Sequence, residues 1–225
     1  MTMTSNLSRP VILDEARAIV RDLLAGQTAP LYYFLELESE EQVQRRAKPL
    51  PYLAAGTHLL ELIDGKTIVE IGAMRIPMLH GIYEFAPSCC NDGHSTAIWA
   101  YTGLEVHSVD INPVCRDVAS TLMESNPNLH CYTEDGIAFL DRFALQIDLL
   151  YLDAWDVHIG HDYAERHLAA YLAGYDKLAP TCIVQIDDTD IYFGGKGELV
   201  VPRLIRDGFE LLITGRQTIL IRVAA

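Results

Sequence analysis

Short apolar runs alternate with amphipathic stretches along most of the chain, from Lys66 onward. The apolar runs predict strands, and the stretches of helical periodicity between them predict helices. The predicted strands lie at 67–71, 105–110, 128–133, 147–153, 181–187, 209–214 and 217–223, and the predicted helices at 94–102, 112–125, 135–143, 161–178 and 197–207. This alternation is typical of an α/β fold with a mostly parallel sheet covered by helices on both faces. Because only Gly215 and Arg216 separate the last two strands, we expect them to form an antiparallel hairpin.

The N-terminal part of the chain has a helical pattern. Apolar residues at helical spacing predict a helix over 12–24, and residues 39–63 predict two further helical stretches broken near Pro49 and Pro51. An aromatic segment at 30–35 is more typical of packed core than of a pocket wall, although lining of a substrate pocket is the alternative.

The change of pattern divides the chain into an N-terminal helical cap, residues 1–65, and a sheet domain, residues 66–225. With 225 residues, 50% of them apolar and 21% charged, the chain is long enough to bury a large core. The cap is also a candidate contact in a homo-oligomer.

Charge and cysteine usage restrict the partners and the compartment. A formal net charge of -14 repels a phosphate backbone, so we expect no nucleic-acid partner. No apolar run approaches the roughly 20 residues of a membrane span, so we also expect no membrane partner. The first six residues are polar and lack the apolar core of a signal peptide. Five cysteines without disulfide-framework spacing favour a cytoplasmic location, and adjacent Cys89 and Cys90 lack zinc-site spacing.

Two predicted strands end in an acidic residue at the same edge of the sheet. The first ends Glu70-Ile71-Gly72, and the second ends at Asp110. In a parallel sheet, such neighbouring strand ends form the crevice where a nucleotide-like ligand lies. Glycine at 72 permits a sharp turn beside the ligand, and Asp110 is placed to accept hydrogen bonds from a ribose diol. The pattern therefore predicts an enzyme with an adenosine-containing cofactor, and the absence of a GxGxxG motif disfavours a dinucleotide.

Four ordered motifs, at 69–72, 109–112, 133–136 and 148–153, resemble those of S-adenosylmethionine-dependent methyltransferases with a seven-stranded Rossmann-like fold. The resemblance covers residues 66–223 and implies the strand order 3-2-1-4-5-7-6. It also implies the position of several residues around S-adenosyl-L-methionine. These are Glu70 and Gly72 at its methionine end, Asp110 and Ile111 at the ribose, Asp135 and Gly136 at the adenine, and Asp153 facing the transferred methyl group.

The chain departs from this family after Gly72, where the usual glycine-rich loop is replaced by an insertion at about 73–93. Gly93, Ser95 and Thr96 then open the next helix, and the amides of that helix start are candidates for holding the cofactor carboxylate. Arg75 either pairs with the same carboxylate or anchors the insertion. We expect the insertion to fold over the active-site mouth and to help define the substrate.

A second acidic group lies at the ends of the fourth and fifth strands. Several carboxylates in one site repel each other unless they share protons or bind a cation, and oxygen ligands suit Mg²⁺. The pattern resembles metal-dependent O-methyltransferases that act on macrolide-type sugars, which implies Asp153, Asp187 and Asp188 as Mg²⁺ ligands. The alternative is that the Asp187-Asp188 pair caps a loop. The same resemblance implies a general base just after the fourth strand, for which Asp156 is the candidate beside Asp153. His158, His161 and His167 are substitutes, because histidine can take a proton near neutral pH.

Three further residues nearby have simpler interpretations. His161 and His167 are expected at the surface or cap of the following helix. Lys196, in a glycine-rich turn that is not a P-loop, is either solvated or reaches into the pocket.

These observations predict methyl transfer from S-adenosyl-L-methionine to a small-molecule substrate, at a hydroxyl oxygen, with Mg²⁺ assistance left open. The resemblance suggests natural-product or polysaccharide biosynthesis. The alternatives are an NAD-dependent or aminopropyl-transferring enzyme on the same fold, and a non-catalytic methyltransferase-like binding module.

Overall fold

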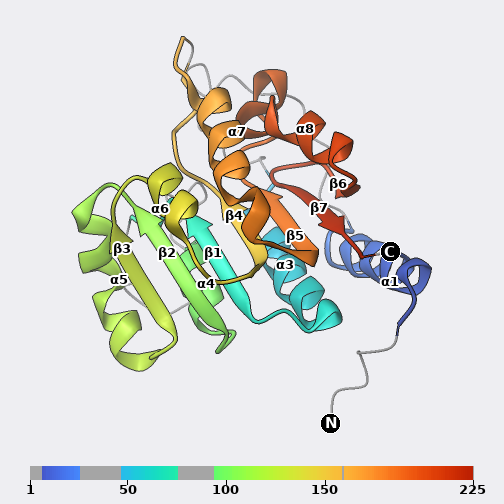
Figure 1. Ribbon diagram of the computed structural model, residues 1–225, viewed down its shortest axis with the longest axis horizontal. Helices are drawn as coiled ribbons and strands as arrows, with labels where there is room; N and C mark the ends of the chain where they lie inside the picture. The colour runs from blue at the N-terminus through green and yellow to red at the C-terminus, as the bar shows by residue number, and fades with distance from the viewer. Residues whose placement is uncertain (1–6, 26–46, 76–93, 159, 225) are drawn as a thin grey trace.

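The computed structural model describes residues 7–25, 47–75, 94–158 and 160–224, and a seven-stranded sheet forms its centre (Figure 1). The strand order is β3-β2-β1-β4-β5-β7-β6. Strands β1 to β5 are parallel, whereas β7 runs antiparallel to both β5 and β6. The strands are β1 Thr67–Ile71, β2 Glu105–Asp110, β3 Leu129–Thr133, β4 Ile147–Leu152, β5 Leu178–Ile186, β6 Glu210–Ile213 and β7 Thr218–Arg222. The fold class, the strand order and the C-terminal hairpin predicted from the sequence are confirmed.

Helices cover both faces of this sheet. Contacts connect α1, α3, α4 and α5 into one layer and α6, α7 and α8 into the other. Figure 1 shows α3 and α4 behind the strands and α6 and α7 in front of them. The first layer is α1 Arg9–Leu23, α3 Pro49–Ile63, α4 Ser95–Ala100 and α5 Pro113–Ser125, and the second is α6 Gly136–Arg142, α7 Tyr163–Gly174 and α8 Val200–Arg206. Two 3₁₀ helices, η3 Tyr175–Lys177 and η4 Tyr192–Gly197, follow α7 and precede α8.

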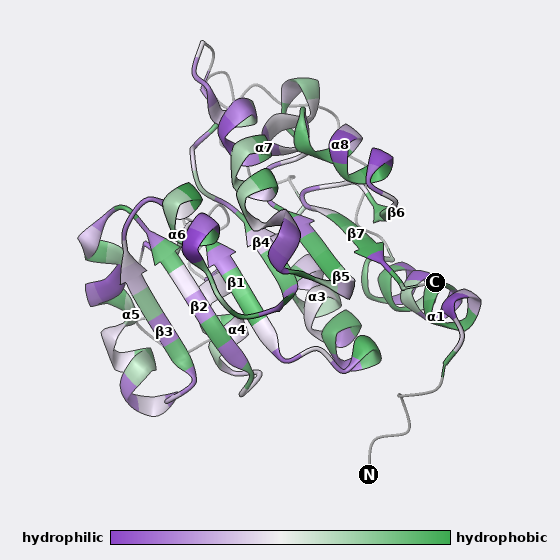
Figure 2. Cartoon of the chain, viewed as in Figure 1, coloured by the Kyte–Doolittle hydropathy of each residue, from purple (hydrophilic) through white to green (hydrophobic). Residues whose placement is uncertain are grey.

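The core has two halves because successive strand residues point to opposite faces. In β4, Leu149 and Tyr151 belong to the half beneath α3 and α4, whereas Leu150 and Leu152 belong to the half beneath α6 and α7. Trp99 of α4 is fully buried and packs edge-on against Tyr151, with ring centroids 5.5 Å apart. Figure 2 shows the central strands as a largely hydrophobic band, as expected for strands buried on both faces.

The N-terminal helices share the first half of the core. Leu53 and Leu59 of α3 are fully buried in the same cluster as Ile183 of β5, and α1 packs on α3. The cap helices in the described residues therefore cover part of the sheet, and the division of the chain at residue 65 stays a prediction. The aromatic segment 30–35 lies outside the described residues, as does all of the predicted insertion beyond Arg75.

The predicted break near Pro49 and Pro51 agrees with the start of α3, because Lys48 is extended and the helix begins at Pro49. Both prolines lie in its first turn, which needs no amide donor. The helical stretch predicted before them lies outside the described residues up to residue 46. Two other predicted element boundaries need correction. The helix predicted over 161–178 ends at Gly174, and β5 begins at Leu178, before Pro180. A register irregularity between β4 and β5 near this point accommodates the proline.

The second correction concerns the helix predicted over 197–207, which begins only at Val200. Phe193, Gly194 and Gly195 precede it with positive φ, so a tight turn occupies the predicted helix start. Of the helices in the described part of the chain, none combines the length and the apolar character needed to cross a membrane.

Candidate functional site

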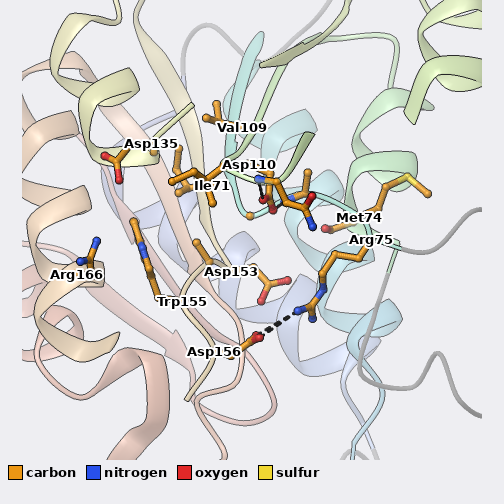
Figure 3. Close-up of a pocket in the computed structure, with 17 residues that line it drawn as sticks. Ile71, Met74, Arg75, Val109, Asp110, Asp135, Asp153, Trp155, Asp156 and Arg166 are labelled. Atoms are coloured by element: carbon orange, nitrogen blue, oxygen red, sulfur yellow. Dashed lines mark hydrogen bonds and ion pairs between the residues drawn. The ribbon is translucent and has the colours of Figure 1, made fainter. Parts of the chain in front are cut away.

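A pocket of about 450 Å³ opens at the carboxyl ends of β1, β2 and β4 (Figure 3). Three turns and parts of three helices form its wall. The lining residues are Ile71 to Arg75, Val109 to Asn112, Asp153 to Asp156, Ser95, Asp135, Gly136 and Arg166. Eight of the predicted cofactor-binding residues are therefore brought together here, namely Gly72, Arg75, Ser95, Asp110, Ile111, Asp135, Gly136 and Asp153.

Gly72 makes the turn at the end of β1 and has a φ of 94°. Its amide donates to the Val109 carbonyl at 2.8 Å, and the Asp153 amide donates to the Ile71 carbonyl at 2.8 Å. A Cβ atom on residue 72 would lie 2.5 Å from the Asp153 carbonyl carbon. Glycine is thus required both by the backbone conformation and by the close approach of β4.

Asp110 ends β2 with its half-buried carboxylate at the pocket wall. Its Oδ2 accepts from the Ala73 amide at 3.1 Å, and its Oδ1 accepts from the Asn112 amide at 2.8 Å. These bonds fix the carboxylate and leave further lone pairs for a ligand, because each carboxylate oxygen accepts two hydrogen bonds.

Asp135 is the N-cap of α6, and its Oδ1 accepts from the Ile137 and Ala138 amides at 3.0 Å each. Beside it, a Cβ atom on Gly136 would lie 2.4 Å from Ile71 Cγ2. The start of α6 therefore packs directly against β1. Asp135 and Gly136 together form the third side of the pocket, which we call the Asp135-Gly136 cradle.

Two of the predicted cofactor contacts need correction. Glu70 is fully buried beneath the pocket and accepts hydrogen bonds from Ser95 Oγ at 2.5 Å, Thr96 Oγ1 at 2.6 Å and the Ser108 hydroxyl. Thr96 is buried with it and accepts from the Met74 amide at 3.0 Å. Neither Glu70 nor Thr96 lines the pocket, because both are used to tie β1 to α4. The predicted contact of Gly93 lies outside the described residues.

Arg75 and Asp156 form an ion pair at the pocket rim, with Arg75 Nη1 3.1 Å from Asp156 Oδ2 and both side chains about half exposed. Figure 3 shows Asp153 between the Asp110 turn and this pair. His158 does not line the pocket; it is exposed, with its ring centroid 5.4 Å from that of His161. The predicted catalytic role of His158 is therefore not supported by its position.

The pocket residues that the sequence analysis did not name include an aromatic and a basic side chain, Trp155 and Arg166. Trp155 lines the pocket with a φ of 47° and packs edge-on against His167, with ring centroids 5.2 Å apart. Arg166 reaches the pocket from α7 and donates from Nε to Asp162 Oδ2 at 2.9 Å. The available signal for Trp155 was an aromatic residue two positions after Asp153, the acid that follows the fourth strand.

His167 is fully buried, in contrast to the predicted surface position. Its Nδ1 lies 2.6 Å from the Tyr163 carbonyl oxygen. Burial lowers the pKa of His167 to about 3, and the positive charge of Lys196 adds to the effect. The imidazole is therefore neutral at physiological pH.

This burial predicts a specific acid sensitivity. The unfolded chain binds a proton at His167 near pH 6.5 and the folded chain does not, so stability present in full above that pH falls as the pH decreases toward 3. From pH 7 to pH 5 the wild type should lose about 2 kcal/mol more than His167→Asn, which keeps a donor near the Nδ1 position. Urea unfolding at both pH values measures this. The exposed His161→Asn is the control, and an equal pH dependence of His167→Asn and wild type would contradict the prediction.

The acids at the ends of β4 and β5 converge as predicted. Asp153, Asp187 and Asp188 each offer a carboxylate oxygen, and these atoms lie within 4.8 Å of one another. Two buried cations accompany them. Lys196 Nζ lies 2.5 Å from Asp153 Oδ1 and 3.0 Å from Asp188 Oδ2, and Arg216 Nη2 lies 3.0 Å from Asp188 Oδ1. Of the two interpretations of Lys196, the structure selects the one in which it reaches inward.

The charges in this cluster control its protonation. Burial raises the pKa of Asp153 well above its usual range, and Asp187 and Asp188 add to the increase while Lys196 opposes it. Burial alone would lower the pKa of Lys196, but the carboxylates of Asp153, Asp188 and Asp187 outweigh it and raise that pKa. Lys196 is therefore a permanent ammonium beside Asp153 and Asp188.

The three acids, as arranged, do not fit a divalent ion. A metal ion at this place would compete with the Lys196 ammonium for Asp153 Oδ1 and Asp188 Oδ2, and with Arg216 for Asp188 Oδ1. No step of the reaction is therefore derived through Mg²⁺.

Comparison with known proteins supports the fold. No family model and no curated protein matches the sequence. The SAH-bound methyltransferase PaMTH1 from Podospora anserina matches with a TM-score of 0.53 at 14% identity, over 98% of this chain and 91% of that one. The SAH-bound O-methyltransferase from Bacillus cereus matches with a TM-score of 0.50 at 13% identity, over 97% and 93%. NSun6 from Pyrococcus horikoshii matches with a TM-score of 0.52 at 14% identity, over 84% and 55%. The chain therefore has the Rossmann-like fold found in S-adenosylmethionine-dependent methyltransferases.

Proposed function

We propose that the protein is a methyltransferase that moves a methyl group from S-adenosyl-L-methionine to a hydroxyl oxygen of a small molecule. The observation that carries this proposal is the convergence of the Gly72 turn, the Asp110 carboxylate and the Asp135-Gly136 cradle on one pocket. Gly72 and Gly136 both line this pocket, and their lack of a Cβ atom lets β1 lie close to β4 and to the start of α6 there. Asp110 provides the acceptor oxygens that a ribose diol requires.

The bound cofactor supplies an activated methyl group on sulfur, so the protein must chiefly align the acceptor and exclude water. Asp153 lines the pocket at the end of β4, and its raised pKa suits it to accept the proton that the hydroxyl loses. The oxygen–methyl bond forms as the sulfur–methyl bond breaks. Asp156, held by Arg75 at the rim, is the second candidate for the proton.

A small acceptor is favoured over nucleic acid by the net charge of -14 and by the acids that line the pocket. The pathway, the cytoplasmic location and a homo-oligomeric state stay predictions from the sequence. The NAD-dependent, aminopropyl-transferring and non-catalytic alternatives are separated by the ligand that binds and by turnover.

Calorimetric titration with S-adenosylhomocysteine tests the cofactor assignment. We expect micromolar binding to the wild type and a dissociation constant about 10- to 100-fold larger for Asp110→Asn, because charged acceptors typically contribute about 1.5–3 kcal/mol to a hydrogen bond. Asp117→Asn, which changes an exposed acid on α5, is the matched control and should bind like the wild type. Two results would contradict the proposal: competition of NAD with S-adenosylhomocysteine, or no binding of S-adenosylhomocysteine to a folded wild type.

A further inference from the structure

The ammonium of Lys196 has three oxygen partners in the acid cluster. It lies 2.5 Å from Asp153 Oδ1, 3.2 Å from the Asp153 carbonyl oxygen and 3.0 Å from Asp188 Oδ2. The two contacts with Asp153 are hydrogen bonds, and the contact with Asp188 is an ion pair. The side chain is 1% exposed, so Lys196 is a buried member of the acid cluster and not a surface lysine that contacts it.

The loop before α8 is shaped to deliver this side chain. Gly194 and Gly195 both have positive φ, and a Cβ atom on Gly195 would lie 1.9 Å from the Asp188 carbonyl oxygen. The Lys196 amide donates to that same carbonyl at 3.3 Å. Glycine at 195 thus lets the loop approach Asp188 closely enough for the adjacent lysine to enter the cluster.

Asp187 is occupied from the opposite side, by the β6–β7 hairpin. Its Oδ1 accepts from Gln217 Nε2 at 2.8 Å and from Arg216 Nε at 3.4 Å. Arg216 is fully buried and also pairs with Asp188. Asp187 and Asp188, which follow β5, are therefore both paired with Arg216 of the hairpin. Lys196 pairs with Asp188 as well, and also with Asp153.

A divalent ion in this cluster would face two buried positive charges. Lys196 and Arg216 already place two positive charges against Asp153, Asp187 and Asp188, at the positions that the charge of a divalent ion would occupy. Like charges a few ångströms apart repel strongly in a partly buried site. Binding an ion would therefore require Lys196 to leave.

We infer that Lys196 takes the place of a divalent metal ion, so that the acid cluster functions without a metal and Lys196 acts as a positioning residue that holds the Asp153 carboxylate at the pocket wall. The first half of this inference, that Lys196 replaces a metal ion, depends only on the contacts within the acid cluster. The positioning part rests on the proposed function, since it assigns Asp153 to the reacting hydroxyl.

Metal binding is the first test, and it does not depend on cofactor binding or turnover. Wild-type protein titrated with Mn²⁺ and Mg²⁺ by calorimetry should show no saturable site at the cluster. Lys196→Ala removes the ammonium and should create a three-carboxylate site. At Mg²⁺ about 100-fold above its dissociation constant, the melting temperature of Lys196→Ala should rise by roughly 5–10 °C over that in EDTA, with no rise for the wild type. In Lys196→Ala/Asp187→Asn the rise should disappear.

Two outcomes would overturn the inference. One is micromolar Mn²⁺ binding to the wild type that Asp188→Asn abolishes. The other is a folded Lys196→Ala that gains no Mg²⁺ affinity. If Lys196→Ala folds only when Mg²⁺ is present, the inference is supported directly. The wild-type titration needs no variant, so it remains decisive even if Lys196→Ala does not fold.

The positioning role is tested separately, by single-turnover methyl transfer with a hydroxyl acceptor. Wild-type turnover should be insensitive to EDTA. Lys196→Ala should lower kcat at least 10-fold with little change in S-adenosylhomocysteine affinity, and Lys196→Arg should recover part of the loss. EDTA-sensitive wild-type turnover contradicts the metal-free cluster. Failure of all variants and wild type to bind S-adenosylhomocysteine contradicts the proposed function alone and leaves the metal titration standing.

Discussion

Replacing Gly72 with alanine should destabilise the protein by about 2–5 kcal/mol and abolish cofactor binding. The new Cβ atom would lie 2.5 Å from the backbone of Asp153 and 2.6 Å from the Ala154 nitrogen, in a region where main-chain atoms cannot swing aside. Overpacking typically costs about 1–3 kcal/mol, and a non-glycine residue in the left-handed region adds about 1–2 kcal/mol. Relief of the clash would separate β1 from β4, which carry two walls of the pocket.

Gly103→Ala is the matched control for this prediction. Gly103 also has a positive φ, 73°, but a Cβ atom there would meet nothing within 4 Å. It should therefore show only the conformational cost of about 1–2 kcal/mol. Urea unfolding and calorimetry with S-adenosylhomocysteine measure both variants. Similar losses of stability for Gly72→Ala and Gly103→Ala would show that the close approach of β4 is unimportant.

Arg216→Met should cost about 3–5 kcal/mol of stability, because it leaves the buried Asp187 and the partly buried Asp188 with one cation fewer. Arg216 is fully buried, and its guanidinium contacts Asp187 at 3.4 Å and Asp188 at 3.0 Å. Burial would lower the pKa of Arg216, but Asp187 and Asp188 outweigh it and raise that pKa, so the charge is permanent. Methionine fills the aliphatic part of the space and isolates the loss of charge.

Two further variants identify the cause of this loss. Arg142→Met removes an exposed arginine paired with Glu134 and should change stability little, because solvent screens surface pairs. Arg216→Met/Asp187→Asn removes one of the uncompensated charges and should recover part of the lost stability. The measurement is urea unfolding at pH 7. Absence of recovery in the double variant would mean that packing, and not charge, accounts for the cost of Arg216→Met.

The sequence alone determined the architecture of the sheet domain. Strand periodicity located all seven strands to within a few residues, because a strand buried on both faces has to be apolar along its length. It also located Gly72, Asp110 and Asp153 at the pocket, since carboxyl ends of adjacent parallel strands necessarily meet at one edge. These features depend on local pattern and on the topology of parallel strands.

The tertiary structure alone decided how the polar side chains are used. Glu70 looked like a cofactor contact, but three hydroxyls from α4 and β2 bind it beneath the pocket. His167 looked like a surface residue, but α7 turns it into the core. Lys196 and Arg216 lie far from Asp153 in sequence, and only the folding of two loops around β5 brings their charges to the acids. Hydrophobic periodicity in the sequence predicts which residues are buried. The pairing of buried charges depends instead on distances between residues that are set only in the folded chain.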